Sequence, residues 1–266
     1  MNANKPAEWP ATDAPHKVLK LVGVLLDYPP EALWESREEL IAAAHDASVP
    51  SARREALAGF VRELLDMDPM LAQERWLGLF DRGRSMSLLL FEHIHGESRD
   101  RGQAMVDLIQ TYRDNGFEMA SKELPDYLPL MLEYLSLRPA VEVVDWLKHT
   151  GHILELLAAR ATERSSSYAI LLSLLVQMGI GEVDLSVMRK RVATEERDDT
   201  VEEMDRVWEE EAVRFGTDSP KDDCAPTRRL PSGARRMESA PEGADAAVHR
   251  VPAAAPGQPG ASKVMP

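Results

Sequence analysis

The strongest constraint on the fold is the spacing of the apolar residues, which recur at helical intervals from residue 18 to residue 215. Proline, glycine and capping residues interrupt this pattern at short breaks. No run of alternating β-branched residues occurs, and no Asn-Gly pair lies between two such runs. Because short connections make neighbouring helices pack antiparallel, the pattern predicts an all-α fold, a single bundle of about nine or ten helices.

Particular residues set the expected helix boundaries. Asp68 followed by Pro69 is typical of a helix start, because the carboxylate caps free N–H groups and proline needs no donor there. Asn115-Gly116 indicates a helix end. Pro125 is expected to open a helix that carries Pro129 in its first turn. The segments expected to be helical are 18–27, 31–47, 51–66, 69–80, 98 or 100 to 114, 125–137, 141–150 with 153–160, 168–178, 185–195 and 200–215.

The composition changes at both ends of the chain. Residues 216–266 hold 8 of the 18 prolines and 5 glycines, and residues 1–14 show no periodic pattern. Such segments bury too little apolar surface to offset the entropy lost on ordering. The sequence therefore predicts one all-helical domain, residues 15–215, between a disordered N-terminus, residues 1–14, and a disordered tail, residues 216–266.

The charge of the chain limits its partners. The sequence holds 45 acidic and 31 basic residues, a formal net charge of -14, which argues against nucleic acid or an anionic membrane surface and favours a basic partner. The single cysteine, Cys224, fits a reducing compartment. No signal-peptide pattern is visible, and the longest nearly apolar stretch, 168–180, is too short to span a bilayer. We therefore expect a cytoplasmic protein without direct membrane insertion.

The sequence holds few arrangements that could carry catalysis. His93 and His95 form a His-x-His pair, but on a helix the two rings would point about 200° apart. No third ligand has metal-site spacing, and we find neither a phosphate loop nor a Gly-x-Ser-x-Gly elbow. We therefore expect no catalytic residue and no metal site. A metal-dependent enzyme that uses His93 and His95 remains the alternative.

The segment 123–137 is the most informative for binding. On a helical wheel it carries two apolar stripes on opposite faces, and Asp126 and Glu133 flank the second. The first stripe is Leu128, Met131, Leu132 and Leu135, and the second is Leu130, Tyr134 and Leu137. Such a helix is either buried between layers or lines a groove with an acidic rim, which would suit an amphipathic helix that bears lysine or arginine. The candidate binding residues are Asp126, Tyr127, Leu130, Glu133, Tyr134 and Leu137.

Several blocks of this sequence resemble one protein family. Residues 80–108 read FDRGRSMSLLLFEHIHGESRDRGQAMVDL, and further matching blocks lie at 25–29, 123–129, 132–135, 196–200 and 207–211. The chain is similar over about residues 17–215 to the NarJ family, the assembly chaperones of respiratory nitrate reductase, which is related to the TorD-type chaperones. Family members often carry histidine where this chain has Tyr127, so any role that needs an imidazole there is in doubt.

The resemblance implies a function. A family member binds the apo catalytic (alpha) subunit of nitrate reductase in the cytoplasm, partly through the N-terminal peptide of that subunit. It keeps the subunit competent for molybdenum-cofactor insertion, catalyses nothing, and binds no cofactor stably itself. Molybdenum-cofactor biosynthesis proteins are further possible partners, and a structural subunit of a larger complex is a second alternative. The candidate residues in the matching block are Phe80, Asp81, Arg82, Phe91, His95, Glu97, Arg99, Asp100, Arg101 and Gln103.

Overall fold

The computed structural model describes residues 14–96, 98–119, 123–200, 202–203 and 205–206. Within these ranges all regular elements are helices, so the predicted all-α class is confirmed. The helices are α1 (Ala14–Leu26), α2 (Ala32–Glu35), α3 (Arg37–His45), α4 (Ser51–Asp66), α5 (Pro69–Phe80), the 3-10 helix η1 (Arg84–Met86), α6 (Leu90–His95), α7 (Asp100–Asp114), α8 (Leu128–Leu135), α9 (Ala140–His149), α10 (Gly151–Glu163), α11 (Ala169–Ile180) and α12 (Ser186–Val192). No described helix is both long and apolar enough to cross a membrane.

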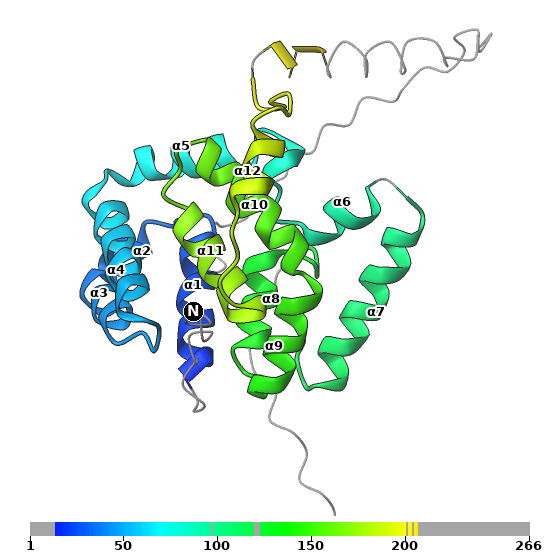
Figure 1. Ribbon diagram of the computed structural model, residues 1–266. Helices are drawn as coiled ribbons and strands as arrows, with labels where there is room; N and C mark the ends of the chain where they lie inside the picture. Colours follow the sequence, from blue (N-terminus) through cyan, green and yellow to red (C-terminus); the bar gives the residue numbers. More distant parts are fainter. Residues whose placement is uncertain (1–13, 97, 120–122, 201, 204, 207–266) are drawn as a thin grey trace, which may run out of the picture.

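The helices gather around α11, whose sequence is apolar on nearly every side. Figure 1 shows α2, α3 and α4 on one side of the molecule and α6 with α7 on the other. Helix α11 packs against α9 and α10, and α8 packs against α1. Eight residues of α11 are buried, among them Leu171, Leu172 and Leu175, which have no solvent exposure. Because apolar residues cover α11 nearly all round, only a position between other helices can bury them.

Several predicted boundaries are confirmed. Helix α4 covers the predicted 51–66, and the Asp68 carboxylate accepts hydrogen bonds from the N–H groups of Met70 and Leu71 at the start of α5. Helix α7 ends before Gly116, whose φ of 77° is a conformation that glycine adopts at low cost. The Oγ1 atom of Thr200 accepts a hydrogen bond from the Glu203 N–H, as expected of a cap. Most of the predicted helix 200–215, and the end segments 1–13 and 207–266, lie outside the described residues.

Three predictions about the helices are wrong. The segment 31–47 forms two helices, because the chain turns at Ser36. Residues 90–95 form α6, a helix that the sequence did not predict. Helix α8 begins at Leu128 rather than at Pro125, although Pro129 does lie in its first turn. Residues 125–127 are not helical because their backbone pairs with another segment, as described below.

Helices α9 and α11 approach each other closely at Gly179. A Cβ atom on this glycine would lie 2.8 Å from the carbonyl carbon, the carbonyl oxygen and the Cβ of Leu147. Real Cβ contacts are almost never that short, so any side chain at this position would push the two helices apart. The contact explains why a glycine stands near the end of an otherwise apolar helix.

Substitution of Gly179 by alanine should therefore destabilise the protein. We expect Gly179→Ala to lower the free energy of unfolding by about 1–3 kcal/mol, because the added methyl group overpacks the interface. The matched control is Gly59→Ala in the middle of α4, where no atom lies within 4 Å of the new Cβ. The control should raise the free energy of unfolding by up to about 1 kcal/mol, since alanine favours helices. Urea unfolding measures both, and a Gly179→Ala variant as stable as the wild type would contradict the packing described.

Candidate functional site

Two segments that are distant in sequence cross next to the start of α8. The Leu90 N–H donates to the Asp126 carbonyl at 3.1 Å, and the Leu128 N–H donates to the Leu88 carbonyl at 2.8 Å. Leu89 and Tyr127 thereby form an isolated antiparallel bridge. The pairing joins the segment that leads into α6 to the segment that leads into α8.

The side chain of Asp126 lies inside this crossing and has no solvent exposure. Its Oδ2 accepts a hydrogen bond from the Phe91 N–H at 2.9 Å, whereas its Oδ1 has no hydrogen-bond partner among the described residues. Burial raises the pKa of this carboxyl, and the Arg101 guanidinium acts in the opposite direction. The prediction that Asp126 lies on an exposed acidic rim is therefore wrong. Its carboxylate is buried and accepts a hydrogen bond from the first turn of α6.

Tyr127, the next residue, also points away from the expected groove. Its hydroxyl donates to the Asp27 carboxylate at 2.8 Å, just after the end of α1. Burial and the nearby Asp27 charge raise the pKa of Tyr127, so the hydroxyl remains a donor at neutral pH. Through this hydrogen bond Tyr127 ties the start of α8 to the end of α1.

The other four predicted binding residues come together in one pocket. Leu130, Glu133, Tyr134 and Leu137 line it from α8 and the turn that follows. The far wall consists of Tyr112, Phe117, Glu118 and Met119. We call this the Tyr134 pocket, because the Tyr134 ring contacts the rings of Tyr112 and Phe117 at centroid distances of 4.6 and 5.3 Å. The first stripe of α8 is buried as the two-stripe pattern predicts, and the second stripe lines this pocket.

The pocket is small, apolar and bordered by carboxylates. Its volume is about 30 Å³, and Leu137 at its edge is 55% exposed. Burial raises the pKa of Glu133, although Lys20 lowers it. Beside the pocket, the Tyr134 hydroxyl donates to Glu142, and Arg138 holds the same carboxylate.

A larger hollow of about 580 Å³ lies over α9. It is lined by Pro139, Val141, Glu142, Asp145, Trp146 and His149. The centroid of the Trp146 ring, which lines the hollow, lies 6.5 Å from that of the Tyr134 ring, which lines the pocket. Val141 is 76% exposed, which leaves apolar surface available beside the carboxylates.

The candidate residues of the 80–108 block do not form a single site. Phe80 is buried against the ring of Tyr168, whereas Asp81 and Arg82 are exposed. The rings of Phe91 and His95 contact each other, and Arg101 pairs with Glu92. Three further candidates, Arg99, Asp100 and Gln103, are exposed at the start of α7. Glu97 lies outside the described residues.

The two histidines of the His-x-His pair have different partners. The Nε2 of His93 lies 2.8 Å from the Ser87 carbonyl, and burial lowers its pKa, so a neutral ring donates this hydrogen bond. His95 instead contacts the Phe91 ring. Among the described residues, no group of three or more histidine, cysteine, aspartate or glutamate side chains could hold a metal ion.

Sequence reasoning missed half of the Tyr134 pocket. Tyr112 belongs to the last turn of α7, but Phe117, Glu118 and Met119 follow the helix end at Gly116 and carry no periodic signal. They reach Tyr134 because the chain turns back after α7, which the Tyr112 hydroxyl fixes by donating to the Pro125 carbonyl at 2.8 Å.

The fold and the pocket define an all-helical protein with an aromatic, acid-bordered surface pocket. A family model described as nitrate reductase delta subunit matches residues 46–172. The nitrate reductase molybdenum cofactor assembly chaperone NarJ of Escherichia coli K12 is 48% identical over 210 residues, which cover 79% of this chain and 89% of that protein. The chain therefore belongs to the NarJ family of nitrate reductase molybdenum cofactor assembly chaperones.

A further sequence relative agrees with this assignment. NarW of Escherichia coli K12, named a probable chaperone of the same kind, is 43% identical over 76% of this chain and 85% of its own length. A solved structure from Archaeoglobus fulgidus, assigned to a redox enzyme maturation protein, has a TM-score of 0.44 and 19% identity and covers 66% of this chain and 97% of that one. The structural similarity is low, and the family assignment rests on the sequence relatives.

The buried carboxyl of Asp126 should make stability depend on pH. Burial raises its folded-state pKa above the usual 3.8, so the folded state favours the protonated acid. The contribution of this carboxyl to the free energy of unfolding is then most favourable below the usual pKa, where it is protonated in both states. This contribution is lost as pH rises through the folded-state pKa. We expect Asp126→Asn, which cannot titrate, to gain stability relative to the wild type as pH rises above about 4. Urea unfolding across this range, with the exposed Asp81→Asn as control, measures the effect; a constant difference would contradict it.

Proposed function

We propose that this protein is an assembly chaperone for the catalytic subunit of a respiratory nitrate reductase. It binds the apo subunit in the cytoplasm and keeps it competent for molybdenum-cofactor insertion before membrane assembly. The observation that carries the proposal is the identity of 48% to a chaperone named for this role, across 89% of its length. Molybdenum-cofactor biosynthesis proteins are candidate partners at the insertion step.

The Tyr134 pocket is the candidate site for the N-terminal peptide of the client. A volume of about 30 Å³ admits the tip of one apolar side chain, and the hollow over α9 offers room for the backbone beside it. Carboxylates of Glu118, Glu133 and Asp145 lie along this path. An amphipathic helix that places one apolar anchor in the pocket and lysine or arginine on the flanking turns would satisfy both features.

The charge of the chain supports a basic ligand. A net charge of -14 attracts a basic segment over a distance, and the carboxylates beside the pocket can pair with it on contact. The aromatic rings of Tyr112, Phe117 and Tyr134 form a rigid wall, because they contact one another. Such rigid aromatic anchors lose little entropy on binding.

In this role the chain needs no catalytic residue and no stably bound cofactor of its own. The molybdenum cofactor belongs to the client, and the chaperone acts on the protein that receives it. The alternative of a metal-dependent enzyme needs His93 and His95 to act together, and they have separate partners here. The alternative of a structural subunit predicts this chain at equal stoichiometry in the mature membrane enzyme, whereas a chaperone would be absent from it.

A charge placed at the pocket edge should weaken client binding. We expect Leu137→Asp to lower the affinity for the N-terminal peptide of the catalytic subunit by at least ~10-fold, because it removes apolar contact and places a carboxylate in the anchor site. Leu137 is 55% exposed, so the fold should tolerate the change. The matched control is Val187→Asp on α12, which is 75% exposed and lies outside the pocket. Titration calorimetry measures both, and equal affinities would refute the assignment of the pocket but not the chaperone role.

A further inference from the structure

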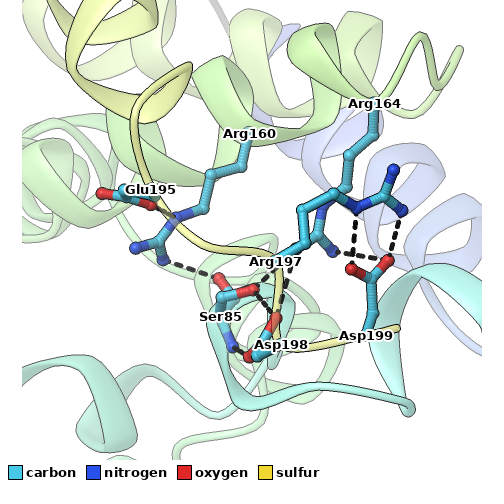
Figure 2. A network of polar contacts seen from close by, with 7 residues as sticks. All are labelled: Ser85, Arg160, Arg164, Glu195, Arg197, Asp198 and Asp199. Carbon is cyan, nitrogen blue, oxygen red and sulfur yellow. Dashed lines mark hydrogen bonds and ion pairs between the residues drawn. The ribbon is translucent and has the colours of Figure 1, made fainter. Parts of the chain in front are cut away.

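A second polar site lies between η1, α10 and the segment after α12. We call residues 193–199 the acidic strap, because they include Glu195, Glu196, Asp198 and Asp199. Figure 2 shows the strap crossing in front of Ser85, with its carboxylates turned toward two arginines of α10. This network shares no residue with the Tyr134 pocket.

Ser85 and Arg164 hold the carboxylate of Asp198. The Ser85 N–H donates to Oδ2 at 2.6 Å, and the Ser85 hydroxyl donates to Oδ1. Arg164 donates to the same Oδ1 at 3.3 Å and to the Ser85 hydroxyl oxygen at 2.8 Å. Burial alone would raise the pKa of Asp198, but the Ser85 hydrogen bonds and the Arg164 charge bring it below its usual range.

The backbone around Ser85 is shaped to admit a carboxylate. At Gly83, a Cβ atom would lie 2.6 Å from the Asp198 Oδ1 and 2.7 Å from its carboxyl carbon. Only a residue without a side chain leaves room for the carboxylate at this depth. Arg160 fixes the same loop from the other side, because it donates to the Ser85 carbonyl at 2.7 Å.

The two arginines cannot lose their acidic partners without a cost. The side chains of Arg164 and Arg160 are 10% and 15% exposed. Arg164 also faces Asp199 at 3.6 Å, and Arg160 donates to Glu195 at 2.8 Å. A guanidinium that is buried without an anion is strongly unfavourable, so the site must always hold a carboxylate or an equivalent anion.

Residues 193–195 of the strap continue the last turn of α12 through backbone hydrogen bonds, and the described contacts that join residues 196–199 to the rest of the protein are polar. None of the described side chains from residue 193 to residue 200 is a buried apolar group. Glu196 and Arg197 are exposed, and a cavity of about 230 Å³ lies beside the strap against Arg160 and Arg164. Because no apolar burial holds the strap, another carboxylate can replace its own without loss of core packing.

We propose that Ser85 and Arg164, on a loop that Arg160 holds through the Ser85 carbonyl, form a carboxylate-binding site that Asp198 and Asp199 of this chain fill, and that an acidic segment of a partner protein takes their place by exchange. The exchange keeps an anion beside Arg164 throughout. It also frees residues 196–199 of the strap. The site is separate from the client-peptide pocket, so this proposal does not depend on the function proposed above.

The test supplies the strap as a separate peptide. The receptor is the full chain with Asp198→Ala and Asp199→Ala, and the probe is a fluorescent peptide of residues 194–200 with blocked ends. We expect saturable binding to this variant by fluorescence anisotropy. The wild-type chain should bind the peptide much more weakly, because its tethered strap competes at a millimolar effective concentration. Adding Arg164→Met to the receptor should abolish binding.

Two controls make the result specific. A peptide with asparagine at both aspartate positions should not bind, and a receptor with only Glu196→Ala should behave like the wild type, because this exposed carboxylate belongs to the strap but has no part in the Ser85 contacts. Circular dichroism checks that each receptor keeps its helix content. Failure of a folded double variant to bind the acidic peptide, or equal binding by the Glu196→Ala chain, would overturn the proposal.

A second measurement covers the case in which the double variant does not fold. A fluorophore on Glu196→Cys, in a chain with Cys224→Ser, reports the mobility of the strap in an otherwise intact protein. Excess acidic peptide should lower the anisotropy of this fluorophore in a saturable way, and the asparagine peptide should not. An anisotropy that stays constant at high concentrations of the acidic peptide would overturn the exchange.

Discussion

The position of the Tyr134 pocket depends on the crossing of segments 88–90 and 126–128 around the buried carboxyl of Asp126. This pairing prevents 125–127 from continuing as helix and makes α8 begin at Leu128. From that start, one face of α8 packs into the core and the opposite face places Tyr134, which is itself largely buried, in the lining of the pocket. A buried carboxyl is unfavourable unless it is hydrogen-bonded, and the Phe91 N–H offsets part of that cost while fixing the first turn of α6.

The sequence predicted the features that depend on local signals. Helix α4 and the Asp68 cap follow from apolar spacing and capping chemistry, and the buried α11 follows from its uniform apolar surface. Features set by tertiary pairing were not predictable in this way. Pro125 is a common helix opener, but its segment pairs with residues 88–90, and the same pairing explains why Asp126 is buried rather than exposed. Of the pocket, the α8 half was visible as a second stripe, whereas Phe117 to Met119 carried no periodic pattern.

The two surfaces differ in the ligand chemistry they fit. The Tyr134 pocket is aromatic and bordered by carboxylates, which suits an apolar anchor among basic residues. The Ser85 site instead presents two arginines and one backbone N–H, which suits an acid. A chaperone must release its client when assembly is complete, and separate sites of opposite charge preference would allow one partner to bind without occupying the place of the other.

The central claim is that this chain handles an immature nitrate reductase catalytic subunit and is absent from the finished enzyme. The most direct measurement is purification of the full chain from cells that respire nitrate, followed by mass spectrometry and metal analysis of what accompanies it. The catalytic subunit should copurify without molybdenum, and the enzyme isolated from the membrane should contain none of this chain. Copurification of a molybdenum-loaded subunit alone, or this chain at equal stoichiometry in the membrane enzyme, would contradict the account.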